Sequence, residues 1–442
     1  MSRLAAAGKQ LAAAGKQLAA AEGKQPRSKE LTVANLLRQY TPAYIKRFPK
    51  QAAPQVQSTL AKLELCWTAA LGGRWLHCSA CDHQCVVYNS CGDRHCPQCR
   101  GGNRADWTKR ASELLLPEVD YFQIVFTLPQ ELSALALGNR RPLYNLLFRS
   151  ASQALSEVMA EQFGLEAASL MVLHTWNQRL EHHPHVHLLV PGGGPSLDGK
   201  RWVKTHHPQH RNKRKPYLVD NRLLSERFRE VFLKSLDRLQ RQGELRVSDQ
   251  SGFDTLLDDM RSIDWVVFIQ APPHENASPE QVIKYLARYM TGGPISDKRL
   301  VSHESGSHES GKVTIRARST EKPADGSPRE QVRVRLDGVE FVRRWSLHIL
   351  PRGFVKVRRY GGFSNRRREV YLELCRQLLG LALSPTDPPE EENDEPGEVF
   401  EEEGNDKCPQ CKEVMITLFH QDRPSWSRTM SGPSRPAWYR DG

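Results

Sequence analysis

Three histidines at alternate positions form the clearest chemical signal in this sequence. His183, His185 and His187 lie within the segment His-His-Pro-His-Val-His-Leu-Leu-Val at 182–190, which a Pro-Gly-Gly-Gly stop follows. Side chains in a strand point alternately to its two faces, so these three imidazoles would share one face. Two imidazoles one pleat apart can hold one divalent cation. The pattern therefore predicts a metal site on His185 and His187; the alternative is a histidine-rich loop without a metal.

The third metal ligand depends on how the neighbouring strand pairs. An apolar segment at 170–176 indicates a strand, and only eight residues lie between it and His185. Such a short connection favours an antiparallel hairpin. That pairing would bring Gln178 near His185. His183, Gln178 and a residue elsewhere in the chain therefore all stand as candidates for the third ligand.

Tyr285 and Tyr289 form the second chemical signal. They are four residues apart in a predicted helix that two glycines stop. Residues at this spacing lie one turn apart on one face of a helix. Packing in a core would explain the spacing, but Lys284 and Arg288 flank the pair, and a phenol oxygen can act as a nucleophile. We expect the tyrosines to attack DNA and the two flanking cations to contact it.

The cysteine spacing predicts a structural zinc. Two Cys-x-x-Cys pairs lie fourteen residues apart, a spacing typical of a zinc ribbon with four thiolates. A bound zinc would also fold a segment too short to have a core of its own. The four predicted ligands are Cys78, Cys81, Cys96 and Cys99.

Further metal sites are left open by the remaining cysteines. Four more candidate ligands surround the two pairs and could complete a second site: Cys66, Cys85, Cys91 and His95. A third Cys-x-x-Cys pair, Cys408 with Cys411, stands near the C-terminus with no other pair close to it in sequence. Spacing alone leaves zinc binding by this third pair undecided.

The charge distribution suits a polyanionic partner. The chain carries a formal charge of +12, although the segment from Asp387 to Asp406 holds eleven acidic residues and neither lysine nor arginine. The remainder is strongly basic, as is typical of proteins that bind nucleic acid. Basic and aromatic residues alternate at 341–367, which suits a groove where cations meet phosphates and rings meet unpaired bases. The predicted DNA contacts outside the tyrosine helix are Arg94, Arg100, Arg104, Arg343, Arg344, Arg352, Lys356, Arg358 and Arg359.

The composition along the chain also indicates the cellular location of the protein and the boundaries of its domains. No apolar run approaches the ~18 residues of a membrane span, and no signal peptide is recognisable, so we expect a cytoplasmic protein without a membrane partner. The predicted parts are a low-complexity repeat extension at 1–30, a helical lead-in with a zinc-binding domain at 31–112, a catalytic domain at 113–383, and an acidic, proline-rich, disordered tail at 384–442.

Five motifs in order resemble a known family. They are Tyr88 to Cys99, Tyr121-Phe-Gln-Ile-Val-Phe-Thr-Leu-Pro129, His183-Pro-His-Val-His187, Tyr285-Leu-Ala-Arg-Tyr289, and Leu350-Pro-Arg-Gly-Phe354 with Arg359-Tyr-Gly361. Over about residues 31 to 380, the chain resembles rolling-circle transposases of the two-tyrosine HUH class, the insertion sequence ninety-one (IS91) family of bacterial mobile elements.

This resemblance implies a fold, a set of cofactors and a reaction. The fold would be α+β, with an HUH-nuclease core of antiparallel sheet flanked by helices, a small zinc-ribbon domain before it, and disordered termini. His185 and His187 would bind Mg²⁺ or Mn²⁺, the ribbon cysteines Zn²⁺, and Tyr285 and Tyr289 would be the nucleophiles. The implied partners are single-stranded element ends, their hairpins and a target site in the DNA of a bacterial nucleoid, together with host replication proteins.

The expected reaction is nicking of single-stranded DNA by a tyrosine, through a 5′-phosphotyrosine intermediate, followed by strand transfer in rolling-circle transposition. Two other functions fit part of the pattern. A plasmid or phage replication initiator or relaxase would use the same chemistry, but the zinc domain and the lack of a G-x-x-x-x-G-K-[ST] motif favour the transposase. A non-catalytic zinc-ribbon protein would bind nucleic acid without cutting it.

Overall fold

The chain divides into two units, each of which mixes helices with β-sheet. The computed structural model describes residues 31–99, 111–206, 217–272, 293–306, 310–319, 329–381 and 407–439. The first unit is formed by 1–101, 296–346 and 387–442, and the second by 102–295 and 347–386. The α+β class is confirmed. The sequence predicted one continuous catalytic domain at 113–383. In the structure, residues 296–346 within that range belong to the first unit instead.

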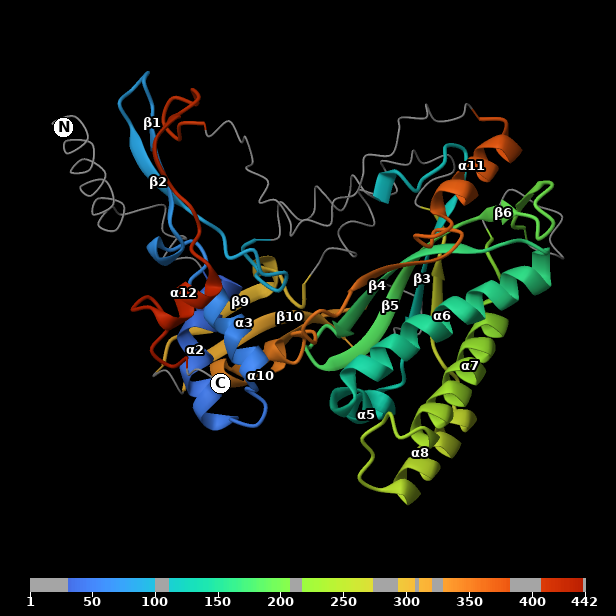
Figure 1. Ribbon diagram of the computed structural model, residues 1–442. Helices are drawn as coiled ribbons and strands as arrows, with labels where there is room; N and C mark the ends of the chain where they lie inside the picture. Colours follow the sequence, from blue (N-terminus) through green and yellow to red (C-terminus); the bar gives the residue numbers. More distant parts are fainter. Residues whose placement is uncertain are drawn as a thin grey trace. The chain divides into compact units, whose positions relative to one another are not determined.

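The first unit contains two three-stranded antiparallel sheets, of order β13-β1-β2 and β11-β10-β9. Its first described helix starts after Thr32, whose side-chain oxygen accepts a hydrogen bond from the amide of Asn35 and so caps the helix. Figure 1 labels most of its elements. They are α2 (Val33–Arg47), α3 (Pro54–Glu64), η1 (Ala69–Leu71), β1 (Gly73–His77), β2 (Gln84–Tyr88), η3 (Asp297–Arg299), β9 (Leu300–Glu304), β10 (Lys312–Arg318), β11 (Gln331–Asp337), α10 (Gly338–Ser346), β13 (Ile416–Gln421) and α12 (Trp426–Ser431).

The C-terminal segment at 407–439 is ordered, where the sequence predicted a disordered tail. Strand β13 pairs antiparallel with β1, with Ile416 opposite His77. Helix α12 follows, and Ser425 caps it through a hydrogen bond from the amide of Arg428. The prediction of disorder throughout 384–442 is therefore wrong for this segment. The reason is that β1 offers β13 a row of backbone hydrogen bonds, which local composition does not reveal.

The second unit is built around a five-stranded antiparallel sheet of order β12-β4-β5-β3-β8. The predicted hairpin between the apolar strand and the histidine strand is β4 with β5. Its elements are β3 (Tyr121–Thr127), η2 (Gln130–Leu132), α5 (Ser133–Gly138), α6 (Arg140–Phe163), β4 (Ala168–Trp176), β5 (His182–Pro191), β6 (Gly193–Pro195), β7 (Trp202–Lys204), α7 (Asn221–Arg241), α8 (Gln250–Ser262), β8 (Val267–Gln270), β12 (Val357–Gly361) and α11 (Arg368–Leu379). None of the helices in the described ranges of the chain is long and apolar enough to cross a membrane.

The two faces of the five-stranded sheet are covered by different helices. Val186 and Leu188 of β5 belong to a large apolar core that α6 and α7 also enter, and these two helices run side by side along the sheet (Figure 1). Leu170 and Leu189 belong to a smaller core with Cys375 of α11. Because side chains alternate along a strand, three histidines share the face of this smaller core. They are His174, His185 and His187.

Gly361 ends β12 in a conformation that other residues rarely adopt, with a φ of 60°. A Cβ atom there would lie 2.0 Å from the carbonyl oxygen of Ala167. That oxygen is held in place because it accepts a hydrogen bond from the amide of Gly362 at 3.1 Å. We therefore expect Gly361→Ala to lower the free energy of unfolding of the second unit by about 2–5 kcal/mol, from left-handed strain plus overpacking.

Gly353 provides the matched control for this prediction. Its φ of 68° is similar, but no described atom would lie within 4 Å of an added Cβ. Gly353→Ala should therefore cost only the backbone strain, about 1 kcal/mol. Urea unfolding followed by circular dichroism would compare both variants with wild type. Equal losses at the two positions would contradict the role assigned to the Ala167 carbonyl.

Candidate metal centres and catalytic site

Three histidines of the second unit converge on one point. The candidate ligand nitrogens of His174, His185 and His187 all lie within 4.8 Å of one another. Their ring centroids are 4.4 Å apart between His174 and His187, and 5.0 Å apart between His185 and His187. His174 and His187 are buried, and His185 is partly buried. We call these three residues the histidine group; its geometry suits a single metal ion.

The register between β4 and β5 explains how the group forms. His174 lies directly opposite His185, and Val172 lies opposite His187. The three side chains are therefore neighbours on one face, across and along the strands. His174 was inside the predicted apolar strand at 170–176, so its residue type was visible in the sequence. The pairing register was the missing information, because it depends on the turn at 177–181.

The two residues proposed from sequence as third ligands occupy other positions than His174 does. Gln178 is exposed in the turn between β4 and β5, which the amide of Asn177 closes by donating to the Glu181 carbonyl at 3.1 Å. The residue directly opposite His185 in the strand pairing is His174 rather than Gln178. His183 lies outside the group, and its Nδ1 faces Oε1 of Gln130 at 3.3 Å.

Hydrogen bonds to Nδ1 orient two rings of the histidine group. Nδ1 of His185 lies 2.8 Å from the carbonyl oxygen of His183, so this nitrogen donates and Nε2 keeps its lone pair. Nδ1 of His187 lies 2.8 Å from the side-chain amide nitrogen, Nε2, of Gln123. A half-turn of that amide presents its oxygen to an Nδ1–H, which leaves Nε2 of His187 with its lone pair as well. Such partners commonly fix the tautomer of a metal-binding histidine.

Burial keeps His185 and His187 neutral. Burial, helped by Lys356, lowers the pKa of His187 to about 4. Burial, with the neighbouring His187, holds the pKa of His185 well below its ordinary value. A metal ion binds the unprotonated form of imidazole. Both residues are already in that form at neutral pH, so no proton has to be displaced when a metal ion binds.

A tryptophan and a lysine border the histidine group. The ring of Trp176 stacks on that of His174, with centroids 4.4 Å apart and planes 21° from parallel. The ammonium group of Lys356 lies 5.4 Å from the Trp176 centroid. Lys356 was predicted from sequence as a DNA contact, and the structure places this cation beside the group.

Two other buried histidines of the second unit make its stability depend on pH. Nδ1 of His348 lies 3.2 Å from Oγ1 of Thr175, and Nε2 of His182 lies 2.8 Å from the hydroxyl of Tyr144. Burial lowers the pKa of each ring to about 3. The unfolded chain, with a histidine pKa of about 6.5, then binds more protons than the folded chain at mildly acidic pH.

We therefore expect the free energy of unfolding to fall as the pH drops below about 6.5. Each of these two histidines contributes stability that is complete above this pH and is lost by up to about 1.4 kcal/mol per pH unit below it. His348→Gln should reduce this slope, because an amide keeps similar hydrogen bonds and does not titrate. Urea unfolding at pH 7 and pH 5 measures both slopes, and an unchanged slope in the variant would contradict the assignment.

Several residues of the predicted site lie outside the described part of the chain. The structure describes the chain up to residue 272 and resumes beyond the predicted tyrosine helix, at residue 293. The predictions for six residues therefore carry over untested: Tyr285, Tyr289, Lys284, Arg288, Arg100 and Arg104.

Other predicted DNA contacts have partners inside the protein. Arg343 and Arg344 both form ion pairs with Glu340, at 2.6 and 2.7 Å. The guanidinium group of Arg358 lies 4.4 Å from the centroid of Phe148. These internal partners would compete with phosphate for the three arginines. The remaining described candidates are exposed or partly exposed: Arg94, Arg352, Lys356 and Arg359.

The cysteines of the first unit form two groups, where the sequence predicted one ribbon site. In each group, the four sulfur atoms lie within 4.8 Å of one another. The prediction of a single site on Cys78, Cys81, Cys96 and Cys99 is wrong, because its two pairs belong to different groups. Sequence spacing identifies a Cys-x-x-Cys pair but does not fix which other thiols complete its site. The first group is Cys66, Cys91, Cys96 and Cys99, and the second is Cys78, Cys81, Cys408 and Cys411.

The first cysteine group has the compactness of a zinc site. The Sγ atom of Cys99 lies 3.3 Å from that of Cys66 and 3.5 Å from that of Cys91. Tetrahedral zinc with Zn–S bonds of about 2.3 Å requires sulfurs about 3.8 Å apart, which small side-chain rotations would provide. The amide of Cys91 also donates to Sγ of Cys66. Hydrogen bonds from Cys66 and Cys91 lower the pKa of Cys99, which favours a thiolate.

The sequence left Cys85 and His95 open as zinc ligands, and in the structure both have other partners. The thiol of Cys85 faces Sδ of Met415 at 4.0 Å. Nδ1 of His95 lies 2.9 Å from a carboxylate oxygen of Asp93. Neither belongs to a cysteine group. Cys66 and Cys91 were the other two cysteines that the sequence left open as zinc ligands. Both belong to the first cysteine group.

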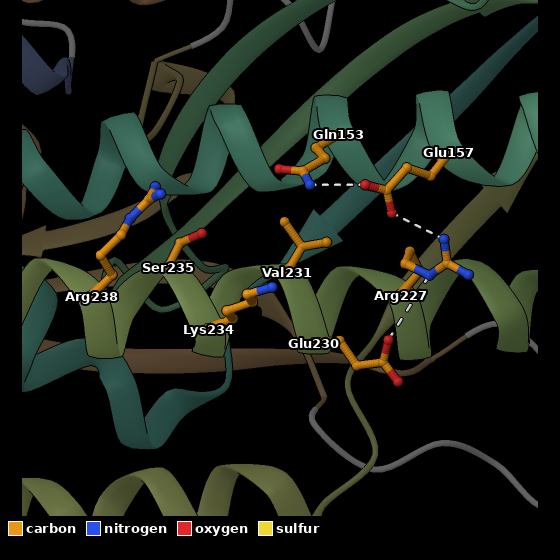
Figure 2. A pocket seen from close by; sticks show the side chains of 8 residues that line it. All are labelled: Gln153, Glu157, Arg227, Glu230, Val231, Lys234, Ser235 and Arg238. Atoms are coloured by element: carbon orange, nitrogen blue, oxygen red, sulfur yellow. Dashed lines mark hydrogen bonds and ion pairs between the residues drawn. The ribbon is translucent and has the colours of Figure 1, made fainter.

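A hollow of about 520 Å³ lies between α6 and α7, away from the histidine-bearing face of the sheet. Figure 2 shows that most of its lining side chains are charged and that Arg227 pairs with both Glu157 and Glu230. Glu157 accepts a hydrogen bond from Gln153 at 2.8 Å and pairs with Arg227 at 3.0 Å. Its lining contains no histidine or cysteine, so this hollow lacks the metal-binding side chains that the histidine group offers.

Comparisons with known proteins agree with this arrangement. Residues 36–128 match a family model described as "Transposase zinc-binding domain", and residues 169–370 match one described as "Putative transposase". The "Putative transposase y4qJ" of Sinorhizobium fredii is 38% identical over 401 residues, which cover 87% of this chain and 94% of that protein. The "Transposase for insertion sequence element IS801" of Pseudomonas savastanoi pv. phaseolicola is 27% identical over 333 residues, 75% of each chain. No solved structure matches the chain.

A zinc-binding domain and a sheet with a buried histidine group in one chain, together with these relatives, define a transposase, a class of DNA-processing enzyme. More particularly, the chain belongs to the IS91 family of transposases that carry an N-terminal zinc-binding domain. DNA is therefore its partner, and the first cysteine group, which lies within the matched zinc-binding domain, supports a structural zinc.

Proposed function

We propose that this transposase nicks single-stranded DNA at the ends of its element through a tyrosine and transfers the strand by rolling-circle transposition. The observation that carries the proposal is the histidine group. It adds His174 to the His185–His187 pair and so completes a set of three imidazoles on one sheet face. The proposed nucleophiles are Tyr285 and Tyr289, on the motif resemblance described above.

The donor set fits a divalent transition metal. Three neutral imidazoles offer nitrogen ligands, which Mn²⁺ accepts more readily than Mg²⁺, since Mg²⁺ strongly prefers oxygen. We therefore favour Mn²⁺ over Mg²⁺ among the two ions considered from sequence. A divalent ion held by His174, His185 and His187 would polarise the scissile phosphate and offset the charge that develops on its oxygens.

The proposed reaction exchanges one phosphoester bond for another. The phenol oxygen of Tyr285 or Tyr289 gives up its proton and attacks phosphorus in line. A bond forms between this oxygen and the phosphorus, the bond to the 3′-oxygen breaks, and the departing 3′-oxygen takes up a proton. The products are a 5′-phosphotyrosine and a free 3′-hydroxyl. Because the new bond keeps the energy of the old one, a 3′-hydroxyl elsewhere can reverse the step without ATP. A second tyrosine would hold a second strand end.

Residues near the histidine group would hold the DNA. Lys356 would neutralise a phosphate beside the group, and the partly exposed ring of Trp176 would stack on an unpaired base. Single-stranded ends, hairpins and host replication proteins are the proposed partners. Their recognition would rest on cations such as the exposed Arg352 and the partly exposed Arg359.

The test is a denaturing gel with labelled single-stranded DNA from the element's two ends. Wild type should give a protein-linked band with Mn²⁺ and none with EDTA. Tyr285→Phe and Tyr289→Phe should each change the pattern, and the double variant should lose the band entirely. Phenylalanine keeps the ring, so folding is preserved while the nucleophilic oxygen is removed.

The controls separate cleavage from binding. Binding of the same DNA, measured by fluorescence anisotropy, should survive in the double tyrosine variant. If wild type binds these strands tightly but forms no covalent adduct with any end sequence or metal, the tyrosine mechanism is wrong and a non-catalytic binder is favoured.

A further inference from the structure

Two Cys-x-x-Cys turns in the first unit share the same backbone geometry. The amide of Cys78 donates to the carbonyl of His83 at 2.8 Å, and the amide of Cys408 donates to that of Glu413 at 2.7 Å. The residue after each pair is left-handed, with a φ of 56° at Asp82 and 67° at Lys412. Each turn therefore directs two thiols to one side, as the knuckles of a zinc ribbon do.

The two turns face each other, and their sulfurs interleave. Sγ of Cys78 lies 3.4 Å from Sγ of Cys411, and Sγ of Cys81 lies 3.5 Å from Sγ of Cys408. Both distances are far longer than the ~2.05 Å of a disulfide, and each cysteine contacts one from the other turn. Four sulfurs that contact one another across two turns match the corners of a tetrahedron around an ion.

Few apolar side chains hold this part of the unit together. The buried cluster around the second cysteine group contains Leu76 and Met415 beside two of the cysteines, with Val87 and Cys85 partly buried against it. Leu76 lies on β1, and Cys85 and Val87 lie on β2, which are two of the three strands of the sheet β13-β1-β2. A core this small rarely fixes a sheet without a metal or a disulfide.

We propose that the second cysteine group binds a second structural Zn²⁺ ion, which joins the C-terminal segment to the zinc-binding domain. The family model for that domain covers residues 36–128 and stops far short of Cys408. The ion would link thiolates that are 333 and 327 residues apart in sequence. On binding, the thiols release their protons, and the ion neutralises part of the charge of the four thiolates. The proposal is independent of strand cleavage.

The experiment counts zinc in the full-length protein. Protein purified under reducing conditions is analysed by elemental mass spectrometry, as wild type and as the Cys408→Ser/Cys411→Ser variant. The variant should hold one zinc ion fewer per chain than wild type. Cys85→Ser is the matched control, because Cys85 lies in the same sheet and outside both groups; it should keep the wild-type content. Equal zinc contents in wild type and the double variant would overturn the proposal.

Two further measurements guard against a variant that simply misfolds. Cys411→His replaces one zinc ligand with another, so it should keep the zinc that Cys411→Ser loses. In wild type, Cys81 and Cys411 are exposed, yet bound zinc should slow their alkylation by iodoacetamide until a chelator is added. Rapid alkylation of both thiols in zinc-replete protein would contradict the site.

Discussion

Replacing His174 with alanine should weaken Mn²⁺ binding about 100-fold or more and abolish formation of the covalent DNA adduct. The reason is geometric: His174 supplies one of three nitrogens that converge within 4.8 Å, and two imidazoles alone leave the ion with fewer protein ligands. Isothermal titration with Mn²⁺ measures the affinity directly, without DNA. The adduct assay then reports whether the loss of metal is also a loss of chemistry.

His183→Ala is the matched control for this prediction. His183 is on the same strand and the same face, but its side chain lies outside the histidine group. Its carbonyl oxygen, which accepts the hydrogen bond from His185, remains in the variant. Mn²⁺ affinity should therefore stay close to wild type. If both variants lose affinity equally, or if His174→Ala binds Mn²⁺ normally, the three-histidine site is wrong.

Loss of the zinc held by the first cysteine group should unfold the zinc-binding domain. Structural zinc contributes about 10–16 kcal/mol in small domains, whereas a whole domain is stable by only about 5–15 kcal/mol. Cys96 is buried in this group, and Cys96→Ser removes one thiolate from it. We expect residues 60–99 to lose protection from hydrogen exchange in this variant, and in wild type treated with a strong zinc chelator.

Cys375→Ser is the control for this second prediction. Cys375 is buried in α11 of the second unit and belongs to neither cysteine group. Its replacement should leave hydrogen exchange in residues 60–99 unchanged. The prediction would be refuted by wild-type protection in Cys96→Ser, or in chelated protein shown by elemental analysis to contain no zinc.

The sequence predicted the elements of the histidine site better than their register. The apolar strand, the histidine strand and their antiparallel pairing are confirmed as β4 and β5. Alternation also placed His185 and His187 on one face. The third member was missed because a strand pair can slide by two residues without changing which side chains are buried. The turn at 177–181 selects the register that sets His174 opposite His185.

The cysteines show the same limit at longer range. The Cys-x-x-Cys pairs were recognisable, because each is a local turn. Their partners were not, because Cys78 meets Cys411 across 333 residues and no local pattern encodes such a contact. The number of cysteines is consistent with two zinc sites. Eight of the ten form two sets of four, and the second set is complete only when the C-terminal pair is included.

Assembly of the first unit from three separated stretches of chain has a consequence for its biosynthesis. Strand β1 receives its partner β13 only after residue 421 has been made, whereas the five-stranded sheet of the second unit has all its strands once residue 361 has left the ribosome. Since domains fold during synthesis as their parts emerge, the sheet unit can form before the first unit closes. A gene copy with a late stop codon would then yield the sheet with its histidines intact and the zinc-binding unit permanently lacking an edge strand.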